Sequence, residues 1–173
     1  MKYVIAENES RAFTRRVPSL PEKQLMRDSK IITQIIRAWD IEGDAEKVKD
    51  IFFRKCHLLS NPRYWEVLRS VWVIAGKTEN AKEFKHYLKS ARPCRSWFMT
   101  VEDAQALDKM EFPITVYRAY ESEPDEGISW TLDKEWCEEY AMGKGRKVKS
   151  RVVERKDIFA YVSRRGEEEI MIL

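Results

Sequence analysis

Three adjacent glutamates, Glu167, Glu168 and Glu169, stand directly before the apolar run at residues 170–173. The apolar run predicts a buried strand, and a carboxylate at the entrance to such a strand loses hydration unless it is paired or put to use. Because side chains alternate along a strand, Glu167 and Glu169 are expected on one face and Glu168 on the other. The α-carbons of Glu167 and Glu169 would lie roughly 6.5–7 Å apart. Two carboxylates at this spacing can act on one ligand, and a solvated glutamate cluster is the alternative.

A second candidate is Arg118, which sits within the β-rich stretch ITVYRAY between Tyr117 and Tyr120. A guanidinium does not lose its charge in proteins, so a buried one needs an anion close by. A diphosphate would satisfy it, and so would a structural carboxylate. The sequence leaves both possibilities open.

The third candidate is the stretch EGISWT, in which Gly127 precedes an alternating pattern. In a strand, Ser129 and Thr131 share one face, while Ile128 and Trp130 take the other face and pack into a core. Two hydroxyl groups then point the same way. An ordinary half-buried strand is the competing interpretation.

Helices are expected to occupy the first two thirds of the chain. Residues 1–21 read as an extended arm, and Thr100 with Asp103 forms a capping-box pattern for a short helix. Apolar residues at three- and four-residue spacing predict the longer helices. The predicted helices span residues 22–40, 45–59, 61–76, 80–91 and 101–109.

Strands are expected after Pro113. One short helix interrupts them over residues 133–143, with Asp133 as its N-cap and Gly143 as its stop. The predicted strands span residues 114–120, 127–131, 147–154, 157–162 and 168–173. The expected fold class is therefore α+β, with a helical region over 22–110 followed by a compact, mostly antiparallel sheet over 111–173. A single integrated domain is the alternative.

Composition narrows the functional class of this 173-residue chain. Its net charge is +3, from 21 basic and 15 acidic residues over 1–110 and 11 basic and 14 acidic residues over 111–173. This balance argues against a nucleic-acid-binding protein. Three cysteines without metal-ligand spacing and only two histidines argue against a metal site and favour a reducing compartment. The chain has no apolar run of 18 residues, so we expect no membrane span and a cytoplasmic location.

Taken in chain order, the three candidates form a combined pattern: an arginine on a strand, a Ser-x-Thr strand and a Glu-x-Glu strand. This pattern resembles mono-ADP-ribosyltransferases of the arginine–serine–glutamate, cholera-toxin-like class. VYRAY, ISWTLDKEWCEEYA and RRGEEEI are similar to compact phage-borne and bacterial versions, which would act in a bacterial host cell. The resemblance covers about residues 113–173. It implies an ADP-ribosyltransferase-like split β-sheet and NAD-dependent transfer of ADP-ribose to a protein side chain, arginine in the first place, with release of nicotinamide.

The resemblance also implies a role for each matching residue. Arg118 would contact the phosphates of NAD or the neighbouring ribose, and Ser129 would hold the catalytic carboxylate in place. Thr131 would support the ribose side of the pocket. Glu169 would bind the ribose 2′-hydroxyl and stabilise the sugar cation, as in glycoside cleavage. Glu167 would orient or deprotonate the incoming nucleophile.

Some details of the pattern stay open. Tyr140 could stack on nicotinamide, or it could pack against the sheet. Trp130 stands where the family has small polar residues, and we expect it to face away from NAD. A bulge within the three glutamates would allow Glu168 to replace a neighbour.

Three other functions compete with protein ADP-ribosylation. Water could replace the protein acceptor, which gives an NAD glycohydrolase. A catalytically silent module could keep the fold and bind a partner, although intact Arg118, Ser129 and Glu169 argue against that. An inverting sugar hydrolase built on Glu167 and Glu169 leaves Arg118 without a purpose. The expected partners are NAD and a protein target.

Overall fold

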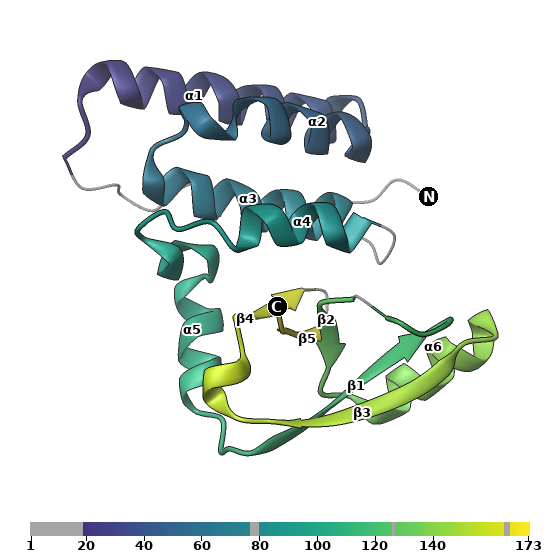
Figure 1. The fold of residues 1–173 in the computed structure, drawn as a ribbon. Helices are drawn as coiled ribbons and strands as arrows, with labels where there is room; N and C mark the ends of the chain where they lie inside the picture. Colours follow the sequence, from purple (N-terminus) through teal and green to yellow (C-terminus); the bar gives the residue numbers. More distant parts are fainter. Residues whose placement is uncertain (1–18, 77–79, 126, 165–166) are drawn as a thin grey trace. The chain divides into compact units, whose positions relative to one another are not determined.

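The computed structural model describes residues 19–76, 80–125, 127–164 and 167–173. Contacts within it define two compact units (Figure 1). One unit comprises residues up to 76 together with 90–98, and the other comprises 77–89 together with 99–173. The boundary predicted near residue 110 therefore does not coincide with this division, because the fourth and fifth helices group with the strands.

The first unit is helical within its described residues. Three long helices supply most of it, and a π-helical turn extends the first one. Its elements are α1 (Glu22–Ile36), η2 (Arg37–Ile41), α2 (Ala45–Lys55), η3 (Cys56–Leu58), α3 (Asn61–Ala75) and η5 (Arg95–Phe98). The predicted helix starts at residues 22, 45 and 61 are confirmed.

A buried carboxylate ties α1 to the start of α3. Asp28 on α1 is 2% exposed. It accepts hydrogen bonds from the Ser60 backbone N–H at 3.0 Å, from the Ser60 hydroxyl at 2.5 Å and from Gln24 Nε2 at 2.7 Å. Ser60 is the N-cap of α3, so Asp28 places a negative charge beside the positive end of that helix. We read Asp28 as structural.

The second unit contains the five strands that the described residues form. Their order in the sheet is β3-β1-β2-β5-β4, and every pair is antiparallel. The α+β fold class and the antiparallel sheet are thus confirmed. The elements of this unit are α4 (Ala81–Leu88), α5 (Val101–Asp108), β1 (Ile114–Tyr120), β2 (Ser129–Thr131), α6 (Lys134–Lys144), β3 (Lys147–Val153), η6 (Arg155–Asp157), β4 (Ala160–Arg164) and β5 (Glu167–Met171).

Helix ends in this unit follow local capping chemistry. Thr100 and Asp103 form the predicted capping box at the start of α5. Asp133 caps α6 by accepting the Trp136 N–H at 2.9 Å, also as predicted. The predicted stop at Gly143 is wrong. The helix continues to Lys144, and Gly145 ends it in the left-handed conformation (φ 63°) that glycine adopts without steric strain.

A hydrophobic cluster fills one face of the sheet. Trp130 of β2 packs against it, and each fully buried aliphatic side chain in it contributes about 2 kcal/mol through removal from water. Asp103 fixes α5 to β4, because it accepts hydrogen bonds from the Ser163 N–H at 3.1 Å and hydroxyl at 2.6 Å. The buried members of the cluster are Leu107, Val116, Val153, Ile158, Tyr161, Ile170 and Ile172.

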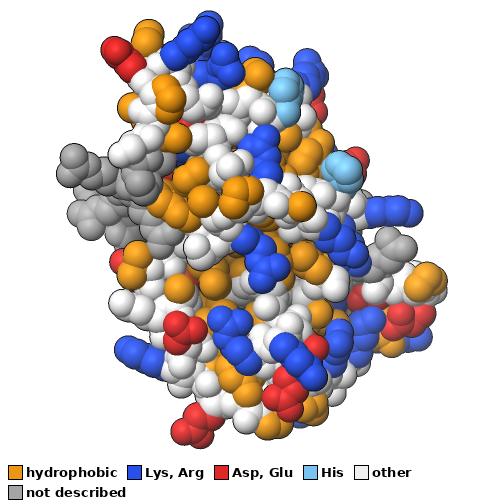
Figure 2. All heavy atoms as spheres, turned by 60° about the vertical axis from the view of Figure 1, so that its left-hand side comes forward, with side chains coloured by type: hydrophobic (Ala, Val, Ile, Leu, Met, Phe, Trp, Pro, Cys, Tyr) orange, Lys and Arg blue, Asp and Glu red, His pale blue; other side chains and the backbone are white. Residues whose placement is uncertain are grey.

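The surface in Figure 2 carries basic and acidic side chains interspersed, with hydrophobic side chains between them. No field of a single sign dominates the face drawn there. Within the described ranges, no helix combines the length and the apolar character that crossing a bilayer requires.

Candidate functional site

Three neighbouring strands carry the three sequence motifs. Arg118 lies on β1, Ser129 and Thr131 form the two ends of β2, and Glu169 lies on β5. The strand order makes β2 the middle strand of this group, hydrogen-bonded to β1 on one side and to β5 on the other. Motifs that are up to about 50 residues apart in the sequence therefore meet on adjacent strands.

The pairing of β2 with β5 brings a hydroxyl and a carboxylate together. Thr131 is the direct partner of Glu169, and Ser129 is the direct partner of Met171. Direct antiparallel partners project from the same face, with β-carbons about 4.5–5.5 Å apart. Ser129, Thr131 and Glu169 thus share a face, as alternation predicts.

The Glu169 side chain lies largely out of water, because the residue is 9% exposed. Burial of a carboxylate is unfavourable unless polar groups solvate it. Thr131 stands opposite, and its hydroxyl oxygen accepts the Asp133 N–H at 3.1 Å. Because the Thr131 oxygen is the acceptor in this bond, the hydrogen of its hydroxyl can be donated to a ligand or to a carboxylate. The pair is suited to hold a sugar hydroxyl beside a negative charge.

Glu168 is placed differently from Glu169. The β4–β5 ladder runs from Arg164↔Glu167 to Ala160↔Met171 without a bulge, so Glu168 projects from the opposite face to Glu169. Glu168 is exposed, and it accepts a hydrogen bond from the Tyr161 hydroxyl at 3.1 Å. Burial, followed by the charge of Glu168, raises the pKa of Tyr161 to about 12.

Glu167 begins β5, and its backbone pairs with Arg164. The side chains of both residues lie outside the described part of the chain. The acceptor-orienting role of Glu167 therefore stays a prediction.

Arg118 is buried, and a carboxylate of the chain itself supplies its anion. The residue is 6% exposed, and its Nε and Nη2 donate to the two oxygens of Asp125 at 2.6 and 3.2 Å. Its Nη1 donates to the backbone carbonyl of Ser129 at 2.6 Å. Of the two anions that the sequence allowed, a diphosphate or a structural carboxylate, this structure contains the carboxylate.

Arg118 does not project from the same face as the other candidates. Tyr117 is the direct partner of Thr131, so alternation along β1 sends Arg118 to the opposite face. The guanidinium lies beside the start of β2, where it contacts the Ser129 carbonyl and lies against Gly127. A β-carbon at Gly127 would come within 1.7 Å of Arg118 Nη2. This geometry therefore disfavours a direct contact between Arg118 and a ligand bound at Glu169.

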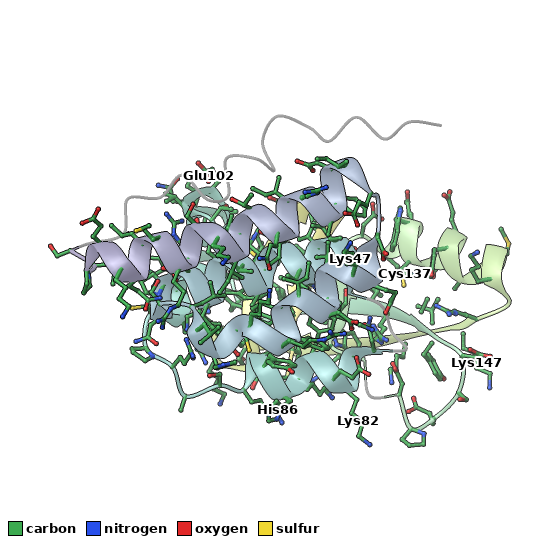
Figure 3. All side chains as sticks on the ribbon, turned by 90° about the horizontal axis from the view of Figure 1, so that it is seen from above. Lys47, Lys82, His86, Glu102, Cys137 and Lys147 are labelled. Carbon is green, nitrogen blue, oxygen red and sulfur yellow. The ribbon has the colours of Figure 1, made fainter. Side chains whose placement is uncertain are left out.

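Tyr140 lies on the exposed side of α6. Its ring stacks on Trp136, with centroids 5.3 Å apart and planes inclined by 6°, and the two residues are 38% and 42% exposed. Arg146 donates to the Tyr140 hydroxyl at 3.3 Å. The nicotinamide-stacking role of Tyr140 therefore stays a prediction. Cys137 of α6, labelled in Figure 3, is buried, and burial raises the pKa of its thiol.

Sequence reasoning missed two charged residues near Arg118. Asp125 follows Arg118 by seven residues in the β1–β2 loop, and Lys149 is the direct partner of Arg118 on β3. Lys149 Nζ lies 3.2 Å from Asp125 and 3.0 Å from Glu123. The Pro-Asp-x-Gly loop was a detectable turn signal, but nothing in its spacing specified an arginine partner.

The described residues contain no group of three or more His, Cys, Asp or Glu side chains arranged to hold a metal ion. Comparison of the chain with protein-family models, with curated proteins and with solved structures finds no match.

Proposed function

We propose that this protein is an NAD-dependent mono-ADP-ribosyltransferase that transfers ADP-ribose to a protein side chain, arginine in the first place, and releases nicotinamide. The observation that carries the proposal is the pairing of Thr131 with the buried Glu169, with the Arg118 strand alongside β2. The resemblance of the three motifs to the arginine–serine–glutamate class supports it. In this proposal the antiparallel sheet is the ADP-ribosyltransferase-like split sheet.

The chemistry needs a fixed negative charge beside a sugar. The C1′–N bond of NAD breaks, and nicotinamide leaves with the bonding electron pair. The ribose then carries oxocarbenium-like positive charge, which a buried carboxylate stabilises more strongly than an exposed one. A guanidine nitrogen of the acceptor forms a bond to C1′ and gives up one proton. In this proposal the buried Glu169 stabilises the positive charge on the ribose. Glu167 accepts the proton that the guanidine nitrogen gives up.

Ser129 and Arg118 take supporting roles in this proposal. Ser129 lies on the Glu169 face, where its hydroxyl can steady the carboxylate or the ribose. Arg118 holds the carbonyl of Ser129 and so acts as a positioning residue for β2. This differs from the phosphate contact that the resemblance implies for Arg118.

One observation favours a second candidate, a catalytically silent binding module. The Arg118–Asp125 ion pair is what a purely structural arginine would also form. An NAD glycohydrolase is the other alternative, and it differs only in the use of water as acceptor. The site is expected to work in the cytoplasm of a bacterial host.

The deciding experiment incubates the full chain with NAD labelled in its adenosine part and with bacterial lysate. Nicotinamide release is measured, and labelled proteins are identified by mass spectrometry. The proposal expects nicotinamide release together with label on arginine. Release without label indicates the glycohydrolase, and neither release nor label indicates the silent module.

A further inference from the structure

Asp125, far from the three glutamates in the sequence, is another buried carboxylate and lies in the loop between β1 and β2. The side chain of Asp125 is 6% exposed. Besides its two hydrogen bonds from Arg118, it accepts the Gly127 N–H at 3.0 Å, and its own N–H donates to Glu123 at 2.8 Å. Asp125 is thus held on every side by groups of its own loop and by the arginine of β1.

The next link runs from Arg118 to β2. Arg118 Nη1 donates to the Ser129 carbonyl at 2.6 Å. β2 has only three residues, and one residue pair, Tyr117↔Thr131, joins it to β1. Three residue pairs join β2 to β5, but towards β1 the strand has only that single pair, so the charge-assisted hydrogen bond from Arg118 is a main tie between the start of β2 and β1.

Lys149 strengthens the same network. Its Nζ contacts Asp125 at 3.2 Å and Glu123 at 3.0 Å, and it lies 4.8 Å from the Tyr120 ring centroid and 5.9 Å from that of Trp130. Two cations therefore share the Asp125 carboxylate. Lys149 is the more exposed of the two, with a side chain that is 26% exposed against 6% for Arg118.

We infer that Asp125 is a positioning residue of the site: it fixes the Arg118 guanidinium, which holds the Ser129 carbonyl and thereby the start of β2, the strand whose Thr131 pairs with Glu169. The functional part of this inference rests on the proposed function. The positional part does not, because it predicts where β2 lies whether or not the chain cleaves NAD.

Two variants disturb the chain of contacts from Asp125 through Arg118 to Ser129, here called the relay, in different ways. Asp125→Asn keeps the size of the side chain and an oxygen for the Gly127 N–H, but it removes the charge that holds the guanidinium. Gly127→Ala changes no charge and instead places a methyl group where Arg118 Nη2 lies. Asp28→Asn is the matched control, since it removes a buried carboxylate from the helical unit.

The experiment compares these three variants with the wild-type chain by nuclear magnetic resonance and by NAD kinetics. We expect Asp125→Asn and Gly127→Ala to shift the backbone resonances of Ser129 and Thr131, while Asp28→Asn leaves them unchanged. We expect kcat for nicotinamide release to fall on the order of 10²-fold in both relay variants, with a much smaller change in KM for NAD, because misplaced groups impair the reacting state most.

The two claims fail separately. Unshifted β2 resonances in a folded Asp125→Asn variant overturn the inference, whatever the activity. An inactive wild-type chain with shifted β2 resonances overturns the proposed function and leaves the positional claim standing. If Asp125→Asn does not fold, the Gly127→Ala resonances decide. A fall in kcat in Asp28→Asn as large as in the relay variants would also contradict the positioning role.

Discussion

Glu168 and Glu169 are neighbours in the chain but differ in surroundings. Glu169 is buried opposite Thr131, whereas Glu168 is exposed and bound to the Tyr161 hydroxyl. The absence of a bulge in the described part of the β4–β5 ladder produces this difference. Alternation along a strand predicted the opposite faces from the sequence, but the sequence left a bulge open and gave no sign of the Tyr161 contact.

We predict that Glu167→Gln separates the two possible fates of ADP-ribose. A guanidinium is cationic at neutral pH and becomes a nucleophile only when a base orients and deprotonates it, whereas water needs less help. Transfer to an arginine analogue should therefore fall strongly while slow NAD hydrolysis largely persists. Both activities are to be measured in the same samples. An equal fall in both would mean that Glu167 acts on NAD and not on the acceptor.

The titration of Tyr161 tests the placement of Glu168 independently of any activity. The folded-state pKa is raised to about 12 from 10.0, so the neutral phenol contributes stability below about pH 10, and this contribution is lost as pH rises toward about 12. Glu168→Gln removes the neighbouring charge and should lower the pKa of Tyr161, although burial remains. Ring carbon resonances of labelled tyrosine, assigned with Tyr161→Phe, give the value. An unchanged pKa would place Glu168 elsewhere.

At the scale of secondary structure, periodicity predicted most of the helices and strands. The start of α1 at Glu22, the capping box at Thr100 and the core-facing Trp130 all follow from local rules that act within a few residues. The contact between Arg118 and Asp125 does not follow from such rules, because it depends on how the β1–β2 loop folds back. The end of α6 was missed by two residues, since Gly143 and Gly145 are both possible stops and only the structure distinguishes them.

We predict that Arg118→Ala destabilises the second unit by about 3 kcal/mol, because it leaves the Asp125 charge buried with only part of its compensation. The phosphate contact that the resemblance implies for Arg118 would instead predict weaker NAD binding with little change in stability. Urea unfolding at neutral pH measures the loss. Arg54→Ala, which breaks an exposed helix ion pair, is the control and should change stability by less than about 0.5 kcal/mol. Equal stabilities for the two variants would contradict the assignment.

The same ion pair sets a dependence on pH. Burial alone would raise the pKa of Asp125, but hydrogen bonds from Arg118 and Gly127 and the charge of Arg118 lower it to about 2. A lowered pKa means that the stabilisation is present above about pH 4 and is lost as pH falls toward about 2. Arg118→Ala should therefore lose less stability than the wild-type chain between these two pH values. A parallel loss in both proteins would count against the pair.

At the scale of the whole molecule, the second unit is assembled from two separate stretches of chain. The predicted catalytic region began at residue 111, but Leu107 and the Asp103–Ser163 contact belong to the same unit. A fragment spanning 111–173 lacks both and should not unfold cooperatively, since loss of one buried leucine costs about 2–5 kcal/mol. A fragment spanning 77–173 contains both stretches, together with residues 90–98 of the first unit, and should show a cooperative transition by circular dichroism. Equal transitions in both fragments would show that α5 is dispensable.

The central claim is that the full chain cleaves NAD with Glu169. The most direct measurement is the rate of nicotinamide release by wild-type protein, by Glu169→Gln and by Glu168→Gln, which removes a neighbouring carboxylate from the other face. The account predicts release by the wild type, a loss of at least about 100-fold in Glu169→Gln and a rate close to wild type in Glu168→Gln. No release by the wild type, or a loss confined to Glu168→Gln, would contradict it.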